Sequence, residues 1–338
     1  MRTILASLLL SSFLCAQAES RPATTSKRTP AQNGTLIVLN KNDATAWLID
    51  APSGVCKAQL EVGVGPHEAA CSPDGKLAVV CNYGDQATIG SSLTLIDVAR
   101  QEVRATLSLA PYRRPHGIQF SSDGKRVAIT AEMDQKLLIV DLEKSTISAT
   151  IPTNARISHM VVVDSAGARG YVTNIGAGSL SVLDLKTKEF VKEVKTDRGC
   201  EGVALRPGTP EVWTTNRAAD TVSVVDTTKL EVVAKLECGK FPLRIAFLPD
   251  GKHALVACTE SDEVVVIDAE SRTVKKRISL AAGAKPAGIL VAPDGSRAWV
   301  AQMAAGGLAE LDLRDFTVVR QVVTGAVPDG MAWSVVSD

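Results

Sequence analysis

The chain has 338 residues, of which 45% are hydrophobic and 22% charged, with 37 basic and 37 acidic side chains. This balance is typical of a globular protein with a large core and argues against a disordered chain. The near-zero net charge gives no support for a polyanionic partner, and the low aromatic content of 4% argues against nucleic-acid binding.

The N-terminus is predicted to be an export signal. Arg2 supplies a positive charge, residues 4–14 form an apolar run, and Ala16-Gln17-Ala18 places small residues at the −3 and −1 positions of a cleavage site. The alternative, a lipid anchor on Cys15, is disfavoured because bulky Leu14 precedes it. The apolar run is too short to cross a bilayer, and no later segment reaches that length. We therefore expect a periplasmic or secreted protein, cleaved after Ala18, with no membrane span.

Seven pairs of an aliphatic residue followed by aspartate mark an internal repeat. Successive pairs are 47, 44, 43, 42, 42 and 44 residues apart, which is the period of a β-propeller blade. The pairs are Ile49-Asp50, Ile96-Asp97, Val140-Asp141, Leu183-Asp184, Val225-Asp226, Ile267-Asp268 and Leu311-Asp312. Turn tetrapeptides such as Ser72-Pro73-Asp74-Gly75 precede most of these pairs and predict a hairpin in each repeat. We interpret the repeated aspartates as turn anchors and not as a calcium site.

Each repeat is predicted to form four short strands, A to D from the inside outward, because brief β-branched runs lie between the turns. The folded body is expected to begin near residue 34, with strands B, C and D only. It ends at Pro328–Ser334, which resembles an unaccompanied strand A. The two ends can therefore complete one blade. The prediction is an all-β, seven-bladed propeller over residues 34–338, preceded by a signal peptide (1–18) and a flexible leader (19–33).

One tetrapeptide gives this repeat a family resemblance. Tyr171-Val172-Thr173-Asn174 is the sequence that names the YVTN repeats, and weaker copies stand at residues 37–40, 79–82 and 213–216. The chain resembles the YVTN-repeat propellers, which include YncE-like periplasmic proteins, surface-layer proteins and propeller subunits of amine dehydrogenases. The resemblance implies the fold and leaves the function open.

The residues that open strand A are expected to line the mouth of the central channel. They are His67, His116, His159, Glu201, Leu243, Ala287 and Asp329. Three of the chain's four histidines thus occupy one structural position in consecutive blades. Imidazoles converging from neighbouring strands suit zinc, copper or iron, so one hypothesis is a three-histidine metal site with an open coordination position, with Glu68 or Glu201 nearby. In the alternative hypothesis these histidines contact a polar ligand or bond to neighbouring backbone.

Basic residues recur in the loops that lead to this mouth. They are Arg113, Arg114, Arg156, Arg198, Arg217, Lys240, Arg244 and Lys285. A ring of guanidinium groups would favour a carboxylate, a phosphate or an acidic peptide; an ordinary solvated rim is the alternative, because acidic residues share the face. Tyr83 begins a segment about five residues longer than its counterparts, which could form a small lid beside His67 or a tolerated loop.

Six cysteines follow the signal, at positions 56, 71, 81, 200, 238 and 258, without a C-x-x-C motif. Their spacing excludes the usual zinc, thioredoxin and c-type haem motifs, and no disulfide pairing follows from it. We expect a monomeric binding propeller that recognises a small anion or a protein partner. The alternatives are a metal-dependent enzyme, such as an oxidoreductase, with His67, His116 and His159 as ligands, and a scaffold subunit of a dehydrogenase-like complex.

Overall fold

A computed structural model describes residues 31–337 of the chain. The predicted export signal lies outside the described residues, as does most of the predicted leader. Two residues at the end of that leader contact the folded body: Ala31 is buried in a cluster with Trp299, and the Gln32 side chain accepts a hydrogen bond from the backbone N–H of Asp294 at 3.1 Å.

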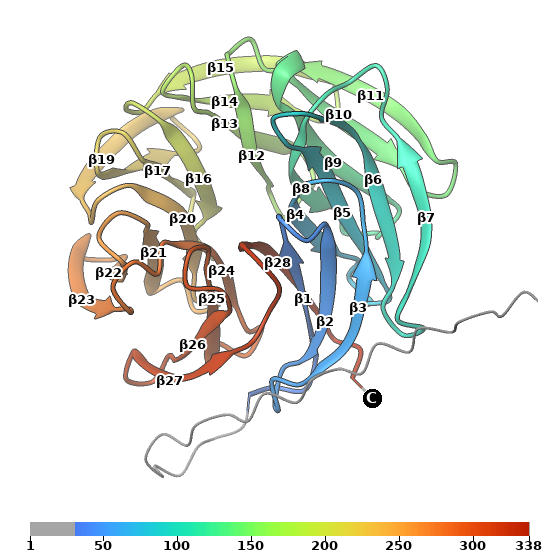
Figure 1. Ribbon diagram of the computed structural model, residues 1–338. Coiled ribbons are helices and arrows are strands. Elements are labelled where there is room, and N and C mark those ends of the chain that lie inside the picture. Colours follow the sequence, from blue (N-terminus) through green and yellow to red (C-terminus); the bar gives the residue numbers. More distant parts are fainter. Residues whose placement is uncertain (1–30, 338) are drawn as a thin grey trace, which may run out of the picture.

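Seven four-stranded antiparallel sheets surround a central channel, which confirms the predicted propeller (Figure 1). The innermost A strands are β28 (Pro328–Ser334), β4 (Pro66–Cys71), β8 (Pro115–Phe120), β12 (Ser158–Val163), β16 (Cys200–Leu205), β20 (Pro242–Phe247) and β24 (Pro286–Val291). The B strands are β1 (Thr35–Asn40), β5 (Leu77–Gly84), β9 (Arg126–Ala131), β13 (Arg169–Asn174), β17 (Glu211–Asn216), β21 (His253–Cys258) and β25 (Arg297–Gln302). The C strands are β2 (Thr45–Asp50), β6 (Ile89–Asp97), β10 (Lys136–Asp141), β14 (Ser179–Asp184), β18 (Thr221–Asp226), β22 (Glu263–Asp268) and β26 (Leu308–Asp312). The outermost D strands are β3 (Cys56–Glu61), β7 (Glu102–Ser108), β11 (Thr146–Pro152), β15 (Glu189–Lys195), β19 (Glu231–Glu237), β23 (Thr273–Ser279) and β27 (Thr317–Val322). One 3₁₀ turn, η1 (Glu132–Asp134), follows β9.

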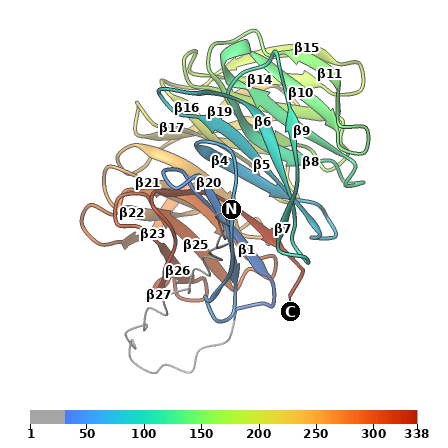
Figure 2. The same ribbon diagram turned by 45° about the vertical axis from the view of Figure 1, so that its right-hand side comes forward.

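The two ends of the chain complete one sheet together. Strand β28 pairs antiparallel with β1, with Thr35 opposite Ser334 and Val38 opposite Met331. The resulting order is β28-β1-β2-β3, and both figures show the two strands side by side (Figures 1 and 2). This sheet is blade 1, and blades 2 to 7 follow in chain order. This pairing closes the ring, because the edges of β28 and β1 that would otherwise be unpaired bond to each other.

The core lies between blades, because strands B and C are buried on both faces. Val264, Val266 and Ile267 of β22 are at most 1% exposed, and side chains of blades 6 and 7 form one apolar cluster between them. The D strands carry many exposed charges, as in β15 with its sequence EFVKEVK. Charged outer edges discourage pairing with another chain.

The repeated aspartates cap the turns between strands C and D, as predicted. In blade 5 the Asp226 carboxylate accepts hydrogen bonds from the backbone N–H groups of Thr228 and Lys229 at 2.8 and 2.9 Å. The turns between strands A and B have the expected geometry as well, since Gly75 adopts a φ of +73°, which favours glycine. The sequence pattern therefore identifies the hairpins correctly.

Glycine allows neighbouring A strands to approach closely around the channel. The third residue of strand A is glycine in four blades, at positions 117, 202, 288 and 330. A Cβ atom at Gly330 would lie 2.1 Å from the backbone oxygen of His67 in the next blade. In the other three blades the same position holds Glu68, Met160 and Arg244. Two of these large side chains meet inside the channel, as described below.

Candidate functional site

Two rings of side chains surround the channel mouth. The first ring is the second residue of each A strand, and it contains the predicted set His67, His116, His159, Glu201, Leu243, Ala287 and Asp329. The second ring is the residue that follows strand B or, in blade 2, its hairpin equivalent: Lys41, Tyr83, Glu132, Ile175, Arg217, Thr259 and Met303. Because A and B are antiparallel, with Pro115 opposite Ala131, both rings lie on one face of the propeller. Blades 6 and 7 contribute only uncharged members, so all the charged residues and all the histidines of the two rings come from blades 1 to 5.

The three predicted histidines lie in a row along the first ring. The ring centroids of His116 and His159 are 3.6 Å apart, and those of His67 and His116 are 5.2 Å apart. His116 and His159 are 2% and 7% exposed, whereas His67 is half-buried. The Nδ1 atom of His67 lies 2.7 Å from the carbonyl oxygen of Gly65, so this nitrogen is already engaged by the backbone.

Tyr83 lies on this row through its hairpin. The lengthened segment was expected to be a loop, but β5 and β6 continue into it, with Gly84 opposite Ile89. Strand geometry therefore fixes the Tyr83 ring 4.1 Å from that of His67 and 5.3 Å from that of His116. The Tyr83 hydroxyl donates a hydrogen bond to Glu132 Oε1 at 2.6 Å.

Glu132 joins the row of histidines from the second ring. Its Oε2 atom lies 2.8 Å from Nδ1 of His159. The sequence pattern does not single out Glu132, because this residue does not open strand A. Its position immediately after strand B was the available signal, since that position faces the mouth in each blade.

The channel beneath the mouth is closed by a buried ion-pair network. Arg244 of blade 6 donates to Glu68 Oε1 of blade 2 at 2.7 Å and to Glu201 Oε1 of blade 5 at 3.2 Å. Blades 2 and 6 are not neighbours, so the first pair spans the channel. Glu201 also lies 2.6 Å from Arg217 Nη1. Arg244, Glu68 and Glu201 are 8%, 8% and 3% exposed.

Five of the six arginines predicted to attract an anion have partners within the protein. Arg113 pairs with Asp134, and Arg156 donates to the carbonyl oxygen of Gly176 at 3.4 Å. Arg114 donates to the carbonyl oxygen of Asp85 at 2.9 Å and lies 4.6 Å above the Tyr83 ring. With the partners of Arg217 and Arg244 already given, these guanidinium groups are largely engaged in internal contacts.

Burial and neighbouring charges give the three histidines different protonation behaviour. Burial lowers the pKa of His67 to about 4. Burial and the adjacent imidazoles lower the pKa of His116 well below its usual value. Burial also opposes the protonation of His159, but Glu201 and Glu132 outweigh it and raise the pKa of this residue. His67 and His116 are therefore neutral near pH 7 and can act as ligands.

Two buried ring nitrogens point to a metal site. His116 Nδ1 and His159 Nε2 have no hydrogen-bond partner among the described residues; His159 Nε2 lies 3.3 Å from Glu201 Oε1 without hydrogen-bond alignment. One ligand atom each from His116, Glu132 and His159 lies within 4.8 Å of the other two. Within residues 31–337 the geometry thus groups Glu132, and not His67, with the two buried histidines.

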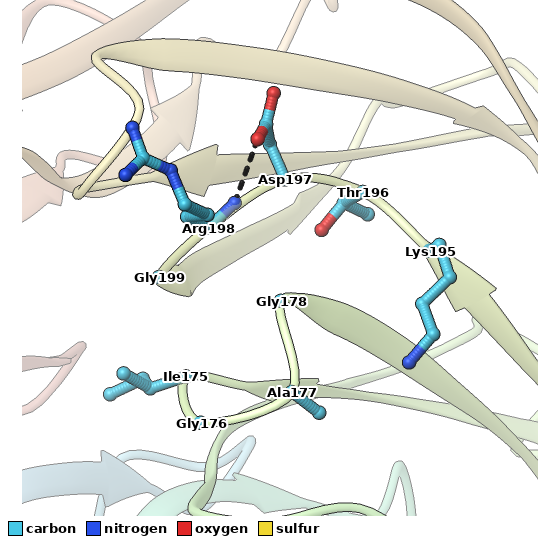
Figure 3. A pocket seen from close by; sticks show the side chains of 9 residues that line it. All are labelled: Ile175, Gly176, Ala177, Gly178, Lys195, Thr196, Asp197, Arg198 and Gly199. Carbon is cyan, nitrogen blue, oxygen red and sulfur yellow. Dashed lines mark hydrogen bonds between the residues drawn. The ribbon is translucent and has the colours of Figure 1, made fainter.

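A separate cavity of about 380 Å³ lies on the rim, away from the histidines (Figure 3). It is formed by the turn at residues 175–178 and the loop at residues 195–199. Lys195 and Arg198 lie at its two ends, and Asp197 accepts a hydrogen bond from the backbone N–H of Arg198 at 2.9 Å. This cavity contains one of the predicted basic residues and none of the predicted metal ligands.

Comparison with known proteins agrees with the propeller geometry. The profile of the cytochrome d1 heme domain matches residues 160–296. The chain is 25% identical to the uncharacterized protein YncE of Salmonella typhimurium over 202 residues, which cover 56% of this chain and 57% of that protein. The chain is a seven-bladed β-propeller similar to YncE. It therefore matches little more than half the length of this YncE relative.

Other similar proteins carry more specific names. The chain is 24% identical to the dihydro-heme d1 dehydrogenase of Pseudomonas aeruginosa over 300 residues, which cover 73% of this chain and 61% of that enzyme. A solved structure of a dihydro-heme d1 dehydrogenase in complex with DHE has a TM-score of 0.67, at 14% identity, and the match covers 93% of this chain and 78% of that one. A hydrazine synthase chain of Kuenenia stuttgartiensis has a TM-score of 0.70, at 17% identity, with 88% and 99% covered. The likeness to these solved structures shows the fold of the YncE-like chain.

No helix among the described residues is long and apolar enough to span a bilayer.

Proposed function

We propose that this YncE-like chain is an extracytoplasmic binding propeller whose channel mouth holds one transition-metal ion on His116, Glu132 and His159. The observation that carries the proposal is the convergence of these three side chains, with a buried, unpartnered nitrogen on each imidazole. Leaving a buried polar atom without a hydrogen bond costs about 1–3 kcal/mol. A bound ion would satisfy His116 Nδ1 directly. If it replaced the proton on His159 Nδ1, the N–H at His159 Nε2 would be left to donate to Glu201 Oε1, 3.3 Å away.

The donor set suits zinc, copper or iron, because these ions accept two imidazoles and a carboxylate. In the metal-free protein a proton lies between His159 Nδ1 and Glu132 Oε2, which are 2.8 Å apart. Tetrahedral bonds of zinc to nitrogen and oxygen place neighbouring ligand atoms about 3.3 Å apart. The three ligand atoms, now within 4.8 Å of one another, would therefore need to draw together by side-chain rotation around the ion.

Three protein ligands leave one position of a four-coordinate ion for water or an anionic group. The anionic ligand expected from the sequence would then bind through the ion, since Arg217 and Arg244 are engaged with Glu201 and Glu68. The rings of His67 and Tyr83 lie 5.2 and 5.3 Å from that of His116, so both residues could contact that ligand. This arrangement supports a role in ligand binding and supplies the open position that a metal-dependent enzyme would use.

A heme-type ligand is a second candidate, because two of the similar proteins are dihydro-heme d1 dehydrogenases. His116 and His159 do not fit this group, since their rings are buried and 3.6 Å apart, which leaves no room for a macrocycle between them. His67 is the only one of the three that is half-buried, and its Nδ1 atom already contacts Gly65. The buried pair thus fits a single ion better than a tetrapyrrole.

Elemental analysis of untagged protein tests the metal site. We expect close to one zinc, copper or iron atom per chain after unbound metal has been removed by dialysis. His116→Ala should lose most of this metal, whereas His253→Ala should keep it, because His253 is half-buried at the start of β21 on the opposite face. Equal metal content in the two variants would contradict the proposal.

Three further outcomes separate the alternatives. If His67→Ala removes as much metal as His116→Ala, the ion is held by the three histidines predicted from sequence. If added heme develops a saturable visible absorption band that is lost in His67→Ala, the heme candidate is favoured. If subunits co-purify while metal and heme are absent, the scaffold role is favoured.

A further inference from the structure

Two cysteines meet between blades 5 and 6. Cys238 follows β19 in the connection to β20, and Cys258 ends β21. Their sulfur atoms are 3.6 Å apart. Cys258 is fully buried, whereas Cys238 is half-buried. Cys71, Cys81 and Cys200 show no such sulfur–sulfur contact with another described residue, so the pair stands apart from them.

The backbone around the pair brings the two residues together without a bulky residue between them. Gly239 packs directly against Cys258, since a Cβ atom at Gly239 would lie 2.7 Å from Cys258 Cβ. The backbone N–H of Cys238 donates to the carbonyl oxygen of Asp220 at 2.9 Å, which holds the connection in place. A disulfide needs its sulfur atoms about 2.0 Å apart, so closure requires a movement of roughly 1.5 Å by two side-chain atoms.

We propose that Cys238 and Cys258 form an intramolecular disulfide that ties the connection between blades 5 and 6 to strand β21. The half-buried Cys238 thiolate attacks a sulfur of an oxidising protein or small-molecule disulfide and releases one thiolate from it. The buried Cys258 thiolate then attacks Cys238 Sγ in the mixed disulfide and releases the second thiolate. The two electrons pass to the oxidant, and the two thiol protons pass to the released thiolates or to solvent.

The charge state of the thiols agrees with this order of attack. The contact with Cys258 lowers the pKa of Cys238, while the same contact and burial raise the pKa of Cys258. Cys238 is therefore the more easily ionised thiol and also the more accessible one. By contrast, burial raises the pKa of the Cys200 thiol to about 11, which keeps it protonated and unreactive.

The bond would stiffen a segment that supports the channel mouth. Phe241 lies in the tethered connection, and the guanidinium carbon of Arg217 is 5.2 Å from its ring centroid. Arg217 in turn pairs with Glu201. Residue 259, directly after Cys258, belongs to the second ring of the mouth. Cross-linking the connection to β21 removes conformational freedom from the unfolded chain and stabilises the fold.

Peptide mapping tests the disulfide directly. Purified protein is equilibrated with oxidised glutathione, alkylated in denaturant without reductant, and digested with trypsin. We expect residues 236–240 and 253–272, which carry one cysteine each, as one cross-linked species that separates on reduction. The oxidised protein should show two fewer titratable thiols per chain and a higher thermal unfolding midpoint than the reduced protein.

Variants make the outcome decisive. Cys258→Ser should abolish the cross-linked species and leave Cys238 as a mixed disulfide with glutathione, while Cys56→Ser should retain the cross-link. Recovery of Cys238 only as the glutathione adduct in the unaltered chain, with Cys258 alkylated, would overturn the proposal. An unchanged unfolding midpoint on reduction would equally contradict a stabilising bond.

Discussion

Replacing Arg244 with methionine should destabilise the propeller strongly. Arg244 is 8% exposed and joins Glu68 on one side to Glu201 on the other. Its removal leaves Glu68 buried with no guanidinium partner, while Glu201 keeps Arg217 at 2.6 Å. Removing one partner of a buried ion pair costs about 3–5 kcal/mol, so we expect Arg244→Met to lower the free energy of unfolding by about 4 kcal/mol.

The double variant Arg244→Met/Glu68→Gln should recover most of this loss, because it also removes the uncompensated charge. Urea unfolding followed by tryptophan fluorescence gives the free energies of the variants. Arg100→Met is the matched control. Arg100 is 75% exposed and pairs with the surface carboxylates of Asp97 and Glu102, and such surface pairs contribute less than about 1 kcal/mol. If Arg244→Met were no more destabilising than Arg100→Met, the buried network would not support the channel.

Deleting residues 327–338 should strip β28 from blade 1 and expose the edges of β1 and its neighbours, so circular dichroism should show loss of cooperative thermal unfolding; an unchanged melting curve would refute closure by the two ends. Acidification should destabilise the fold between about pH 4 and pH 2, because turn hydrogen bonds lower the pKa of Asp226 to about 2. A carboxyl group with a lowered pKa contributes stability that is lost as the pH falls through that pKa. Asp226→Asn should therefore make stability less dependent on pH in this range. Tyr83→Phe removes the hydrogen bond to Glu132 and should weaken zinc binding about 10–100-fold, as loss of a partner that orients a ligand commonly does. Competition with a chelating dye measures the zinc affinity. If the control variant Tyr112→Phe bound zinc as weakly as Tyr83→Phe, the hydrogen bond to Glu132 would not explain the loss.

The sequence was sufficient for the fold because the propeller repeats one local pattern. Each blade reuses the same aliphatic-Asp turn, and blades 2 to 7 also share a glycine turn between strands A and B. A wrong assignment in one blade would therefore have disturbed the regular intervals along the chain. The closing strand was predictable for the same reason, since Pro328–Ser334 carries the strand A pattern without a following strand B. The second residue of strand A was likewise predictable, and it placed His67, His116 and His159 on one ring.

Contacts between blades could not be predicted from the repeat pattern. The approach of Glu132 to His159 depends on the rotation of blade 3 against blade 4, and the pairing of Arg244 with Glu68 depends on the width of the channel. Neither quantity is encoded in the spacing within a repeat. The basic loops suggested a positive funnel, but most of these arginines are engaged within the protein. Their partners are carboxylates of the same or another blade and backbone carbonyl oxygens. The meeting of Cys238 with Cys258 has the same origin, because it joins the end of one blade to the next.

Anomalous diffraction at the zinc edge, from crystals grown with zinc, would show directly which side chains hold the ion. We expect one strong peak in the channel mouth, about 2.0–2.2 Å from a nitrogen of His116, a nitrogen of His159 and an oxygen of Glu132. A peak coordinated by His67 in place of Glu132 would contradict this ligand set. A mouth without any peak, in protein that binds zinc elsewhere, would contradict the metal site itself.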